Sequence, residues 1–154
     1  MLNQSKRVCI VTGSARGIGA ATALAAARQG YAVCINYVDA RAAAEAIADH
    51  VRARGGTAIC MRADVSAPSD VDALFTAVDR ELGQVPALVN NAGVSGGRRP
   101  IVDMPPQDFA RVVDINLGGT FLCSQAAIAR MARSRGGAGG AIVNLSTAAV
   151  RTGG

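Results

Sequence analysis

The chain has 154 residues, of which half are apolar and 3% aromatic, and it carries a formal net charge of +5. This length suits one compact domain with a buried core, and the apolar content argues against a disordered protein. The arginines that carry the charge are spread along the sequence without interleaved aromatics, so we expect no nucleic-acid partner.

Short apolar runs alternate with longer segments of helical composition. The predicted strands are residues 7–12, 32–37, 57–62, 87–90 and 141–145. The predicted helices are residues 18–29, 40–54, 69–82 and about 106–133. Such alternation is typical of βαβ units, whose right-handed crossovers build a parallel sheet with both faces covered. We therefore predict an α/β fold with a doubly wound, Rossmann-type parallel sheet in a single domain over residues 1–154.

Glycines and short polar segments mark the predicted helix limits. Gly30, Gly55 and Gly83 follow the first three helices, as C-terminal glycine signals do. Residues 66–69, Ser-Ala-Pro-Ser, predict a capped start for the third helix, and the acidic residues after them complement its positive end. The glycine pair 118–119 interrupts the fourth helix, which predicts either a bend or close packing against a neighbour.

The spacing of the cysteines and the first residues of the chain indicate the cellular compartment. Cys9, Cys34, Cys60 and Cys123 lie far apart in apolar stretches, so we interpret them as small buried residues in a reducing compartment, with no metal site. Residues 1–7 are polar and lead straight into a strand, which predicts no secretory signal. No apolar run reaches about 18 residues. These patterns predict a cytoplasmic protein without a membrane partner.

A glycine-rich turn joins the first predicted strand to the first predicted helix. It reads Thr-Gly-Ser-Ala-Arg-Gly-Ile-Gly over residues 12–19. Glycines at this place let backbone N–H groups approach a diphosphate, which the positive end of the following helix then stabilises. The turn therefore predicts a dinucleotide-binding site. The alternative is a tight turn without a ligand.

The spacing TGxxxGIG resembles the short-chain dehydrogenase/reductase family. Further motifs of that family follow in order: Asp64-Val65 after the third strand, Asn90-Asn91-Ala92-Gly93 after the fourth, Asn116 within Val-Asp-Ile-Asn, and residues 142–146 in the fifth strand. The resemblance extends over essentially the whole chain and is closest to the glucose dehydrogenase-like and 3-oxoacyl-[acyl carrier protein] reductase-like branches. It implies an enzyme, an oxidoreductase that transfers a hydride between NADP(H) or NAD(H) and a small-molecule carbonyl or secondary alcohol.

The resemblance also implies which residues bind the cofactor. In the family, the aspartate at the place of Asp64 bonds the adenine amino group with help from the next backbone unit, and the Asn-Asn-Ala-Gly segment lines the ribose on the nicotinamide side. An ordinary loop before a helix is the alternative for Asp64, and Asn90 is interpreted as structural. The expected cofactor-binding residues are Gly13, Ser14, Arg16, Gly17, Ile18, Gly19, Tyr37, Asp64, Val65, Asn91, Ala92 and Gly93.

The end of the second strand bears on the choice of cofactor. A carboxylate there accepts from the adenosine 2′-hydroxyl and repels a 2′-phosphate, but Tyr37 holds that place. Arg16 resembles the family's basic residue that meets the 2′-phosphate, and Arg41 is a candidate second contact. Asp39 and the lack of an arginine at position 38 favour the opposite choice. We expect NADP(H) to be preferred, with NAD(H) as the alternative.

Family members combine hydride transfer with a tyrosine that passes the proton and a lysine that lowers its pKa. A serine bonds the reacting oxygen and an asparagine supports a proton relay. Asn116 matches the asparagine, with a bent helix interior as the alternative. Alignment with the family's NxSS pattern places Thr147 at the catalytic hydroxyl, with Ser146 as the weaker candidate. Ordinary strand-end residues are the alternative for both.

The family's YxxxK motif does not occur in this sequence. Tyr31 and Tyr37 are interpreted as belonging to the adenosine side, and Lys6 precedes the first strand, so none of them replaces the pair. We interpret the chain as the front part of the fold, with the C-terminal part, its catalytic segment and later strands missing, and expect little turnover from these residues alone. The alternative is a non-catalytic dinucleotide-binding or interaction domain. The resemblance further implies a homo-oligomer, a tetramer or a dimer.

Overall fold

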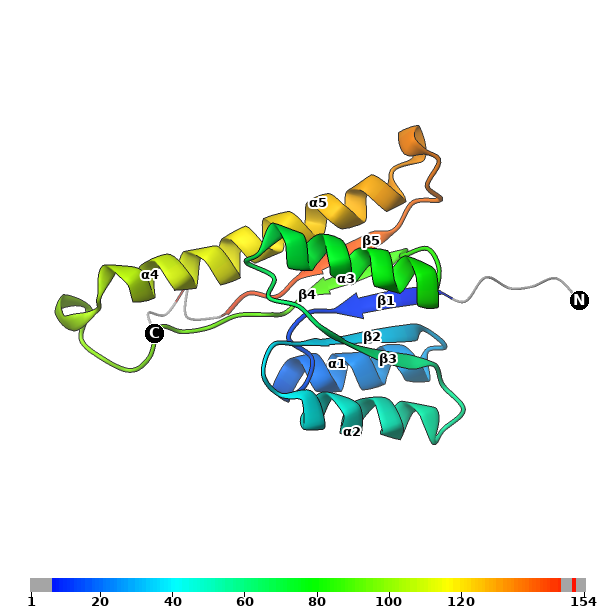
Figure 1. Cartoon of the computed structure of the whole chain (residues 1–154), viewed down its shortest axis with the longest axis horizontal. Helices are drawn as coiled ribbons and strands as arrows, with labels where there is room; N and C mark the ends of the chain where they lie inside the picture. Colours follow the sequence, from blue (N-terminus) through cyan, green and yellow to red (C-terminus); the bar gives the residue numbers. More distant parts are fainter. Residues whose placement is uncertain (1–6, 148–150, 152–154) are drawn as a thin grey trace, which may run out of the picture.

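Five strands form one parallel sheet in the order β3-β2-β1-β4-β5 (Figure 1). The computed structural model describes residues 7–147 and residue 151, so Lys6 lies outside the described residues. The order runs outward from β1 in both directions, which confirms the predicted doubly wound, Rossmann-type sheet. The strands are Val8–Val11 (β1), Ala32–Tyr37 (β2), Ala58–Arg62 (β3), Ala87–Asn90 (β4) and Ala141–Asn144 (β5).

Helices cover both faces of this sheet. α1 and α2 lie on one face, and α3 and α5 lie on the other (Figure 1). A π-helical turn, Asp114–Gly119, joins α4 to α5, so that the two form one long rod. The helices are α1 (Gly17–Arg28), α2 (Arg41–Arg52), α3 (Pro68–Glu81), α4 (Pro106–Val113) and α5 (Thr120–Met131), with 3₁₀ turns at Ile101–Asp103 and Arg133–Arg135.

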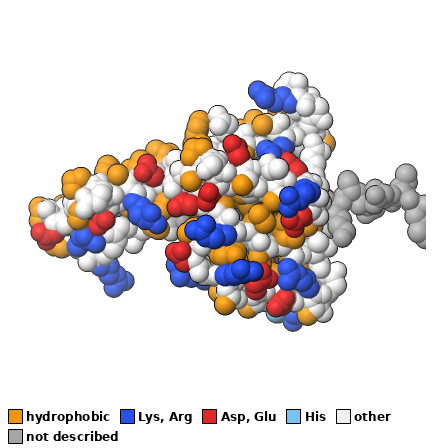
Figure 2. Space-filling model, viewed as in Figure 1, with side chains coloured by type: hydrophobic (Ala, Val, Ile, Leu, Met, Phe, Trp, Pro, Cys, Tyr) orange, Lys and Arg blue, Asp and Glu red, His pale blue; other side chains and the backbone are white. Residues whose placement is uncertain are grey.

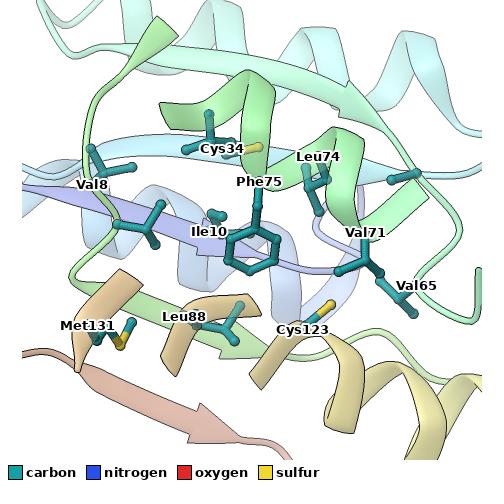
Figure 3. Packing of buried hydrophobic residues seen from close by; sticks show 14 of the residues in the cluster. Val8, Ile10, Cys34, Val65, Val71, Leu74, Phe75, Leu88, Cys123 and Met131 are labelled. Atoms are coloured by element: carbon teal, nitrogen blue, oxygen red, sulfur yellow. The ribbon is translucent and has the colours of Figure 1, made fainter. Parts of the chain in front are cut away.

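Two apolar clusters, one on each face of the sheet, form the core. Successive residues of a strand point to opposite faces. Val8 and Ile10 of β1 therefore join the cluster under α3 and α5, whereas Cys9 and Val11 join the cluster under α1 and α2. Phe75 of α3 is fully buried within the first cluster (Figure 3). Because helices cover both faces, every residue of β1 and β2 is buried, which explains their nearly continuous apolar sequence.

The predicted limits of the helices and strands agree with the structure to within two residues. Gly30, Gly55 and Gly83 follow the first three helices with φ angles of +82°, +76° and +101°. Residues with a side chain rarely adopt this backbone conformation, whereas glycine adopts it without a steric penalty. The prediction that these glycines end the helices is therefore confirmed.

The predicted cap of α3 is wrong. The N-cap residue is Ala67, and no side chain there bonds the first turn. The hydroxyl of Ser66 donates instead to Oδ1 of Asp64, at 2.6 Å. The carboxylate of Asp70, in the first turn of the helix, accepts from the backbone N–H of Asp64 at 2.9 Å. The polar residues at this helix start therefore order the preceding loop rather than the helix.

Three of the four cysteines are buried as predicted, and the fourth is not. Burial raises the pKa of the Cys9 thiol to about 11 and that of Cys123 to about 12, and it also raises the pKa of Cys34. Cys60 lies on the outer strand β3 and is only partly buried, which corrects the prediction. Desolvation, followed by the nearby Glu45 carboxylate, raises the pKa of Cys60 to about 11. All four groups are neutral thiols near neutral pH.

The fourth predicted helix continues through its glycine pair. Gly119 is buried, and a Cβ placed on it would lie 2.5 Å from Cγ2 of Val65. The nearest atom to a Cβ on Gly118 is the carbonyl oxygen of Val113, at 3.8 Å. Close packing against a neighbouring element, one of the two predicted alternatives, is therefore confirmed for Gly119.

One helix among the described residues, Pro106–Met131, is long and apolar enough to cross a membrane by length and composition. Charged residues interrupt the apolar stretches of this helix, so it is no continuous apolar run of about 18 residues, and the absence of a membrane partner stays a prediction. A core helix of a soluble protein meets the same criterion. Composition alone therefore does not assign this helix to a membrane.

We expect the two adjacent glycines to respond in opposite ways to alanine. Gly119→Ala places a Cβ against Val65 and should lower the free energy of unfolding by about 1–3 kcal/mol. Gly118→Ala adds a methyl group at ordinary van der Waals distance from Val113 within a helix and should raise it by about 0.5–1 kcal/mol. Denaturant unfolding of both variants measures the two effects, and equal changes would contradict the packing described here.

Candidate cofactor-binding site

A cavity of about 400 Å³ opens at the carboxyl edge of the sheet, beside the turn between β1 and α1. The strand order reverses between β1 and β4, and ligands of open α/β sheets bind at such a switch point. The ends of four strands and the helix α4 contribute to the cavity wall. The predicted residues that line it are Gly13, Arg16, Tyr37, Asp64, Val65, Asn91, Ala92 and Gly93.

Reciprocal hydrogen bonds tie the glycine turn to the segment that follows β4. The hydroxyl of the buried Thr12 accepts from the backbone N–H groups of Asn91, at 2.9 Å, and Ala92, at 3.0 Å. In return, Nδ2 of Asn91 donates to the carbonyl oxygens of Thr12, at 2.8 Å, and Gly13, at 3.0 Å. These bonds fix the position of the turn relative to the Asn-Asn-Ala-Gly segment.

Strand β2 holds the other side of the turn. The N–H of Gly13 donates to Oδ1 of Asn36 at 3.0 Å, and the N–H of Ser14 donates to the carbonyl oxygen of Asn36 at 2.9 Å. The Ser14 hydroxyl donates to the carbonyl oxygen of Val11 at 2.6 Å and accepts from the N–H of Asn36 at 3.1 Å. The amides of Gly13 and Ser14 thus have acceptors within the protein, so both residues shape the turn rather than offer free donors.

The first turn of α1 supplies the remaining donors. The first amides of a helix have no acceptor within the helix. The helix begins after Arg16, and the N–H of Ala20 bonds back to the Arg16 carbonyl oxygen at 3.3 Å. The helix therefore leaves the amides of Gly17, Ile18 and Gly19 available at its positive end, where an anion is stabilised.

The glycines of the turn fit a dinucleotide diphosphate. A Cβ on Gly19 would meet Nδ2 of Asn91 and lie 2.7 Å from the carbonyl oxygen of Gly13. A Cβ on Gly13 would lie 2.9 Å from Cα of Ala92. Gly17 has a φ angle of +58°, and a Cβ on it would meet no atom within 4 Å. Two glycines therefore allow the turn to pack closely, and the third leaves the backbone open to an approaching anion.

Asp64 follows β3 and is held in a polar loop. Its Oδ1 accepts from the Ser66 hydroxyl at 2.6 Å and from the Ser66 N–H at 3.0 Å. The bond from the Ser66 hydroxyl is the main cause that lowers the pKa of Asp64, and the positive charges of Arg111 and Arg62 add to it, while desolvation opposes them. Asp64 is therefore ionised at neutral pH.

The structure corrects part of the predicted surroundings of Tyr37. Arg16 and Asp39 both line the cavity near the end of β2. Arg41, the candidate second contact, is the first residue of α2 and is not among the described residues that line the cavity. Arg111 of α4, which the sequence did not indicate, lines the cavity instead. Two arginines, Arg16 and Arg111, and two carboxylates, Asp39 and Asp64, thus line the cavity.

Asn116 lies in the π-helical turn and holds the chain that follows Gly93. Its Oδ1 accepts from the N–H of Val94, and its Nδ2 donates to the carbonyl oxygen of Val94, both at 2.9 Å. The Asn116 carbonyl oxygen accepts from the Thr120 hydroxyl at 2.8 Å. Asn116 therefore stands beside the predicted nicotinamide side, and it also lies in an irregular helix, which was the alternative interpretation.

Ser146 and Thr147 follow the end of β5 and are exposed. The N–H of Leu145 donates to the carbonyl oxygen of Asn90 at 2.9 Å, which fixes the start of this segment beside β4. Neither Ser146 nor Thr147 is among the described residues that line the cavity. The structure thus does not bring them together with the cofactor-side residues, and their catalytic roles stay predictions.

Tyr31 does not lie on the adenosine side, which corrects the prediction. It directly precedes β2 at the amino end of the strand, away from the cavity, and the guanidinium of Arg7 lies 4.7 Å from the centre of its ring. Tyr37 ends the same strand and lines the cavity, and its role in cofactor binding stays a prediction.

The sequence of this chain is similar to those of known proteins over most of its length. A family model described as short chain dehydrogenase matches residues 7–154. The chain belongs to this family. The predicted family is confirmed, and with it the broader conclusion that the relatives of this protein are oxidoreductases.

Three relatives illustrate the similarity. An uncharacterized oxidoreductase of Escherichia coli (strain K12), YgfF, is 42% identical over 146 residues, which cover 95% of this chain and 59% of that protein. The 3-oxoacyl-[acyl-carrier-protein] reductase FabG of Staphylococcus aureus is 38% identical over 138 residues, 90% of this chain and 54% of that protein. The 3-oxoacyl-[acyl-carrier-protein] reductase of Synechocystis is 37% identical over 143 residues, which cover 93% of this chain and 56% of that protein. The chain thus spans little more than half the length of these relatives.

Sequence reasoning missed three residues of the site. Asn36 carried a usable signal, because it is a polar residue within an otherwise apolar strand, and buried polar groups require partners. Thr12 belongs to the recognised motif, but its double acceptor role depends on the position of β4. Arg111 gave no signal, because only the path of α4 past the end of β3 brings it to the cavity.

We expect Ser66→Ala to raise the pKa of Asp64 toward its ordinary value. The Ser66 hydroxyl stabilises the charged form of the carboxylate, so its removal favours the protonated form. Carboxyl NMR titration measures the change. Ser69→Ala, which removes an exposed hydroxyl from the first turn of α3, is the matched control and should leave the pKa unchanged. An unaltered Asp64 titration in Ser66→Ala would contradict the assigned cause.

Proposed function

We propose that this protein is an NADP(H)-preferring oxidoreductase that transfers a hydride between its cofactor and a small-molecule carbonyl or secondary alcohol. The observation that carries the proposal is the set of amides at Gly17, Ile18 and Gly19, which α1 leaves available next to a cavity at the switch point of the sheet. Relatives named 3-oxoacyl-[acyl-carrier-protein] reductase support a carbonyl group as the reacting centre.

In this proposal the dinucleotide lies along the carboxyl edge of the sheet. The diphosphate accepts from the free amides of α1. The adenine amino group donates to the ionised carboxylate of Asp64, and the backbone of Val65 assists. The ribose on the nicotinamide side lies against Asn91, Ala92 and Gly93, which line the same cavity.

The bound nicotinamide supplies or accepts the hydride. On this chain, the hydroxyl of Thr147, or that of Ser146, donates to the reacting oxygen as charge develops on it. The side chain of Asn116 is engaged by Val94, so its backbone carbonyl oxygen, which also accepts from the Thr120 hydroxyl, is the group that accepts from a relay water in this proposal. The hydroxyl thus orients the reacting oxygen, and the Asn116 carbonyl oxygen holds a water through which a proton moves.

We expect Arg16→Ala to weaken NADPH binding about tenfold more than NADH binding, because a charge-assisted bond to the 2′-phosphate is lost. Calorimetric titration of both cofactors measures the difference. Arg28→Ala, which removes an exposed arginine from the last turn of the same helix, should change neither affinity. Equal losses for both cofactors, or tighter NADH binding by the unmodified protein, would contradict the preference. If neither cofactor binds at millimolar concentration, the whole proposal fails.

A second candidate function is that of a non-catalytic dinucleotide-binding or interaction domain. The observation that favours it is the place of the two tyrosines, since Tyr31 lies at the amino end of β2 and Tyr37 is almost fully buried. Protein sequencing of the natural polypeptide past residue 154 distinguishes the two functions. A tyrosine followed four residues later by a lysine supports the enzyme, and its absence supports the binding domain.

We further propose that the protein assembles with copies of itself, as a dimer or tetramer in the cytoplasm, without a membrane or nucleic-acid partner. Apolar side chains lie exposed along one helical rod, and Figure 2 shows hydrophobic side chains gathered along its upper edge. A monomeric soluble protein rarely exposes such a continuous apolar patch. The exposed apolar residues of this rod are Phe109, Val113, Leu117, Phe121 and Ile128.

We expect Phe121→Glu to lower the molar mass of the assembly at least by half, because it places a charge where Phe121 is 62% exposed in one chain but covered in the assembly. Light scattering coupled to size-exclusion chromatography measures the mass. Ala43→Glu, on the exposed face of α2, is the matched control and should leave it unchanged. An unmodified protein that is monomeric, or that sediments with lipid vesicles, would contradict the proposal.

A further inference from the structure

Asn36 is a buried carboxamide at the carboxyl end of β2 with no assigned role in the proposed reaction. It is 1% exposed, although its strand is otherwise apolar or aromatic. Its Oδ1 accepts from the N–H of Gly13 at 3.0 Å. Its Nδ2 donates to the carbonyl oxygens of Met61, at 3.3 Å, and Ala63, at 3.0 Å. One side chain thus bonds three backbone groups from two other segments.

The chemistry of these partners fixes the orientation of the carboxamide. The N–H of Gly13 can only donate, and the two carbonyl oxygens can only accept. The opposite orientation would place the amide nitrogen, a donor, against the N–H of Gly13. It would also place the amide oxygen, an acceptor, against the two carbonyl oxygens. No other side chain of this length offers an acceptor on one side and a double donor on the other, so Asn36 satisfies all three groups at once.

The bonded groups belong to the two segments that the proposed cofactor joins. Gly13 lies in the glycine turn, whose following amides face the diphosphate. Ala63 directly precedes Asp64 and Val65, the residues proposed to meet the adenine. The Asn36 carboxamide therefore bridges the segment proposed to bind the diphosphate and the segment proposed to bind the adenine. Asn36 itself is one of the residues that line the cavity.

We infer that Asn36 is a positioning residue that sets the spacing between the diphosphate-binding turn and the adenine-binding loop. This inference rests on the proposed dinucleotide-binding function. A ligand that spans two subsites gains affinity only when their spacing matches its own length, because its second half then binds at a high effective concentration. Loss of the bridge should therefore weaken a spanning ligand and spare ligands that occupy one subsite.

Calorimetry or NMR titration of the intact protein with three probes tests the inference. ADP spans both subsites, adenosine occupies the adenine side, and inorganic pyrophosphate occupies the turn. We expect Asn36→Ala to raise the Kd for ADP about tenfold and to leave the Kd values for adenosine and pyrophosphate within about twofold of the unmodified protein. A purely structural loss of the site would weaken all three probes together.

Asn90→Ala is the matched control, because Asn90 is also a buried asparagine near the carboxyl end of an inner strand. Its Nδ2 donates to the Ser124 hydroxyl at 3.0 Å and to Oδ1 of Asn144 at 2.8 Å, away from the adenine side. This variant should bind all three probes as the unmodified protein does. If Asn36→Ala does not fold, Asn36→Thr, whose side chain suits a strand but is too short to bridge the three groups, takes its place.

Two results would overturn this inference and leave the proposed function standing. The first is an unchanged Kd for ADP in the Asn36 variant while the unmodified protein binds ADP. The second is a loss of adenosine or pyrophosphate affinity as large as the loss for ADP, because it would mean that Asn36 shapes only one subsite. If the unmodified protein binds neither ADP nor NADPH, the proposed function fails, and this inference fails with it.

Discussion

The need to pair buried polar groups governs the carboxyl edge of this sheet. Among the described residues, the buried polar side chains are those of Thr12, Ser14, Asn36 and Asn90, and all of them stand at or just past the ends of three inner strands. An unpaired polar group at such a place costs about 1–3 kcal/mol. Thr12 and Ser14, which belong to the glycine turn, bond β1, β2 and the segment after β4, and Asn36 bonds Gly13 within the turn. The turn is therefore fixed in shape before a ligand arrives. The amides at the start of α1 are consequently pre-organised for an anion.

The two halves of the glycine turn have different roles. The first half, around Gly13 and Ser14, is bonded on both sides, to the segment after β4 and to β2. The second half, from Gly17 to Gly19, keeps its donors free at the positive end of the helix. The motif that appears in the sequence as a single phosphate-binding loop thus has two parts. The first part is fixed by hydrogen bonds to the protein, and the second offers backbone amides to an anion.

The sequence allowed the architecture to be predicted because local signals decide it. Apolar periodicity and the glycines after each helix depend on neighbours a few residues away, so the element limits agree with the structure to within two residues. Features that depend on distant contacts were predicted less well. Residues 66–69 were expected to cap α3, but no side chain caps its first turn, and the Ser66 hydroxyl donates to Asp64 instead. Arg41 was expected at the cavity, but Arg111 lines it instead, because the path of α4 decides which arginine is near.

The widened turn in the α4–α5 rod also affects the outer surface of the molecule. Val113, Leu117 and Phe121 are four residues apart, a spacing that winds slowly around a regular helix of about 3.6 residues per turn. A π-helical turn takes up more residues, because its bonds join residue i to residue i+5. It therefore offsets the winding over Asp114–Gly119 and brings these three exposed side chains toward one side of the rod. The irregularity that places Asn116 against Val94 thus also aligns the exposed apolar side chains of α4 with those of α5.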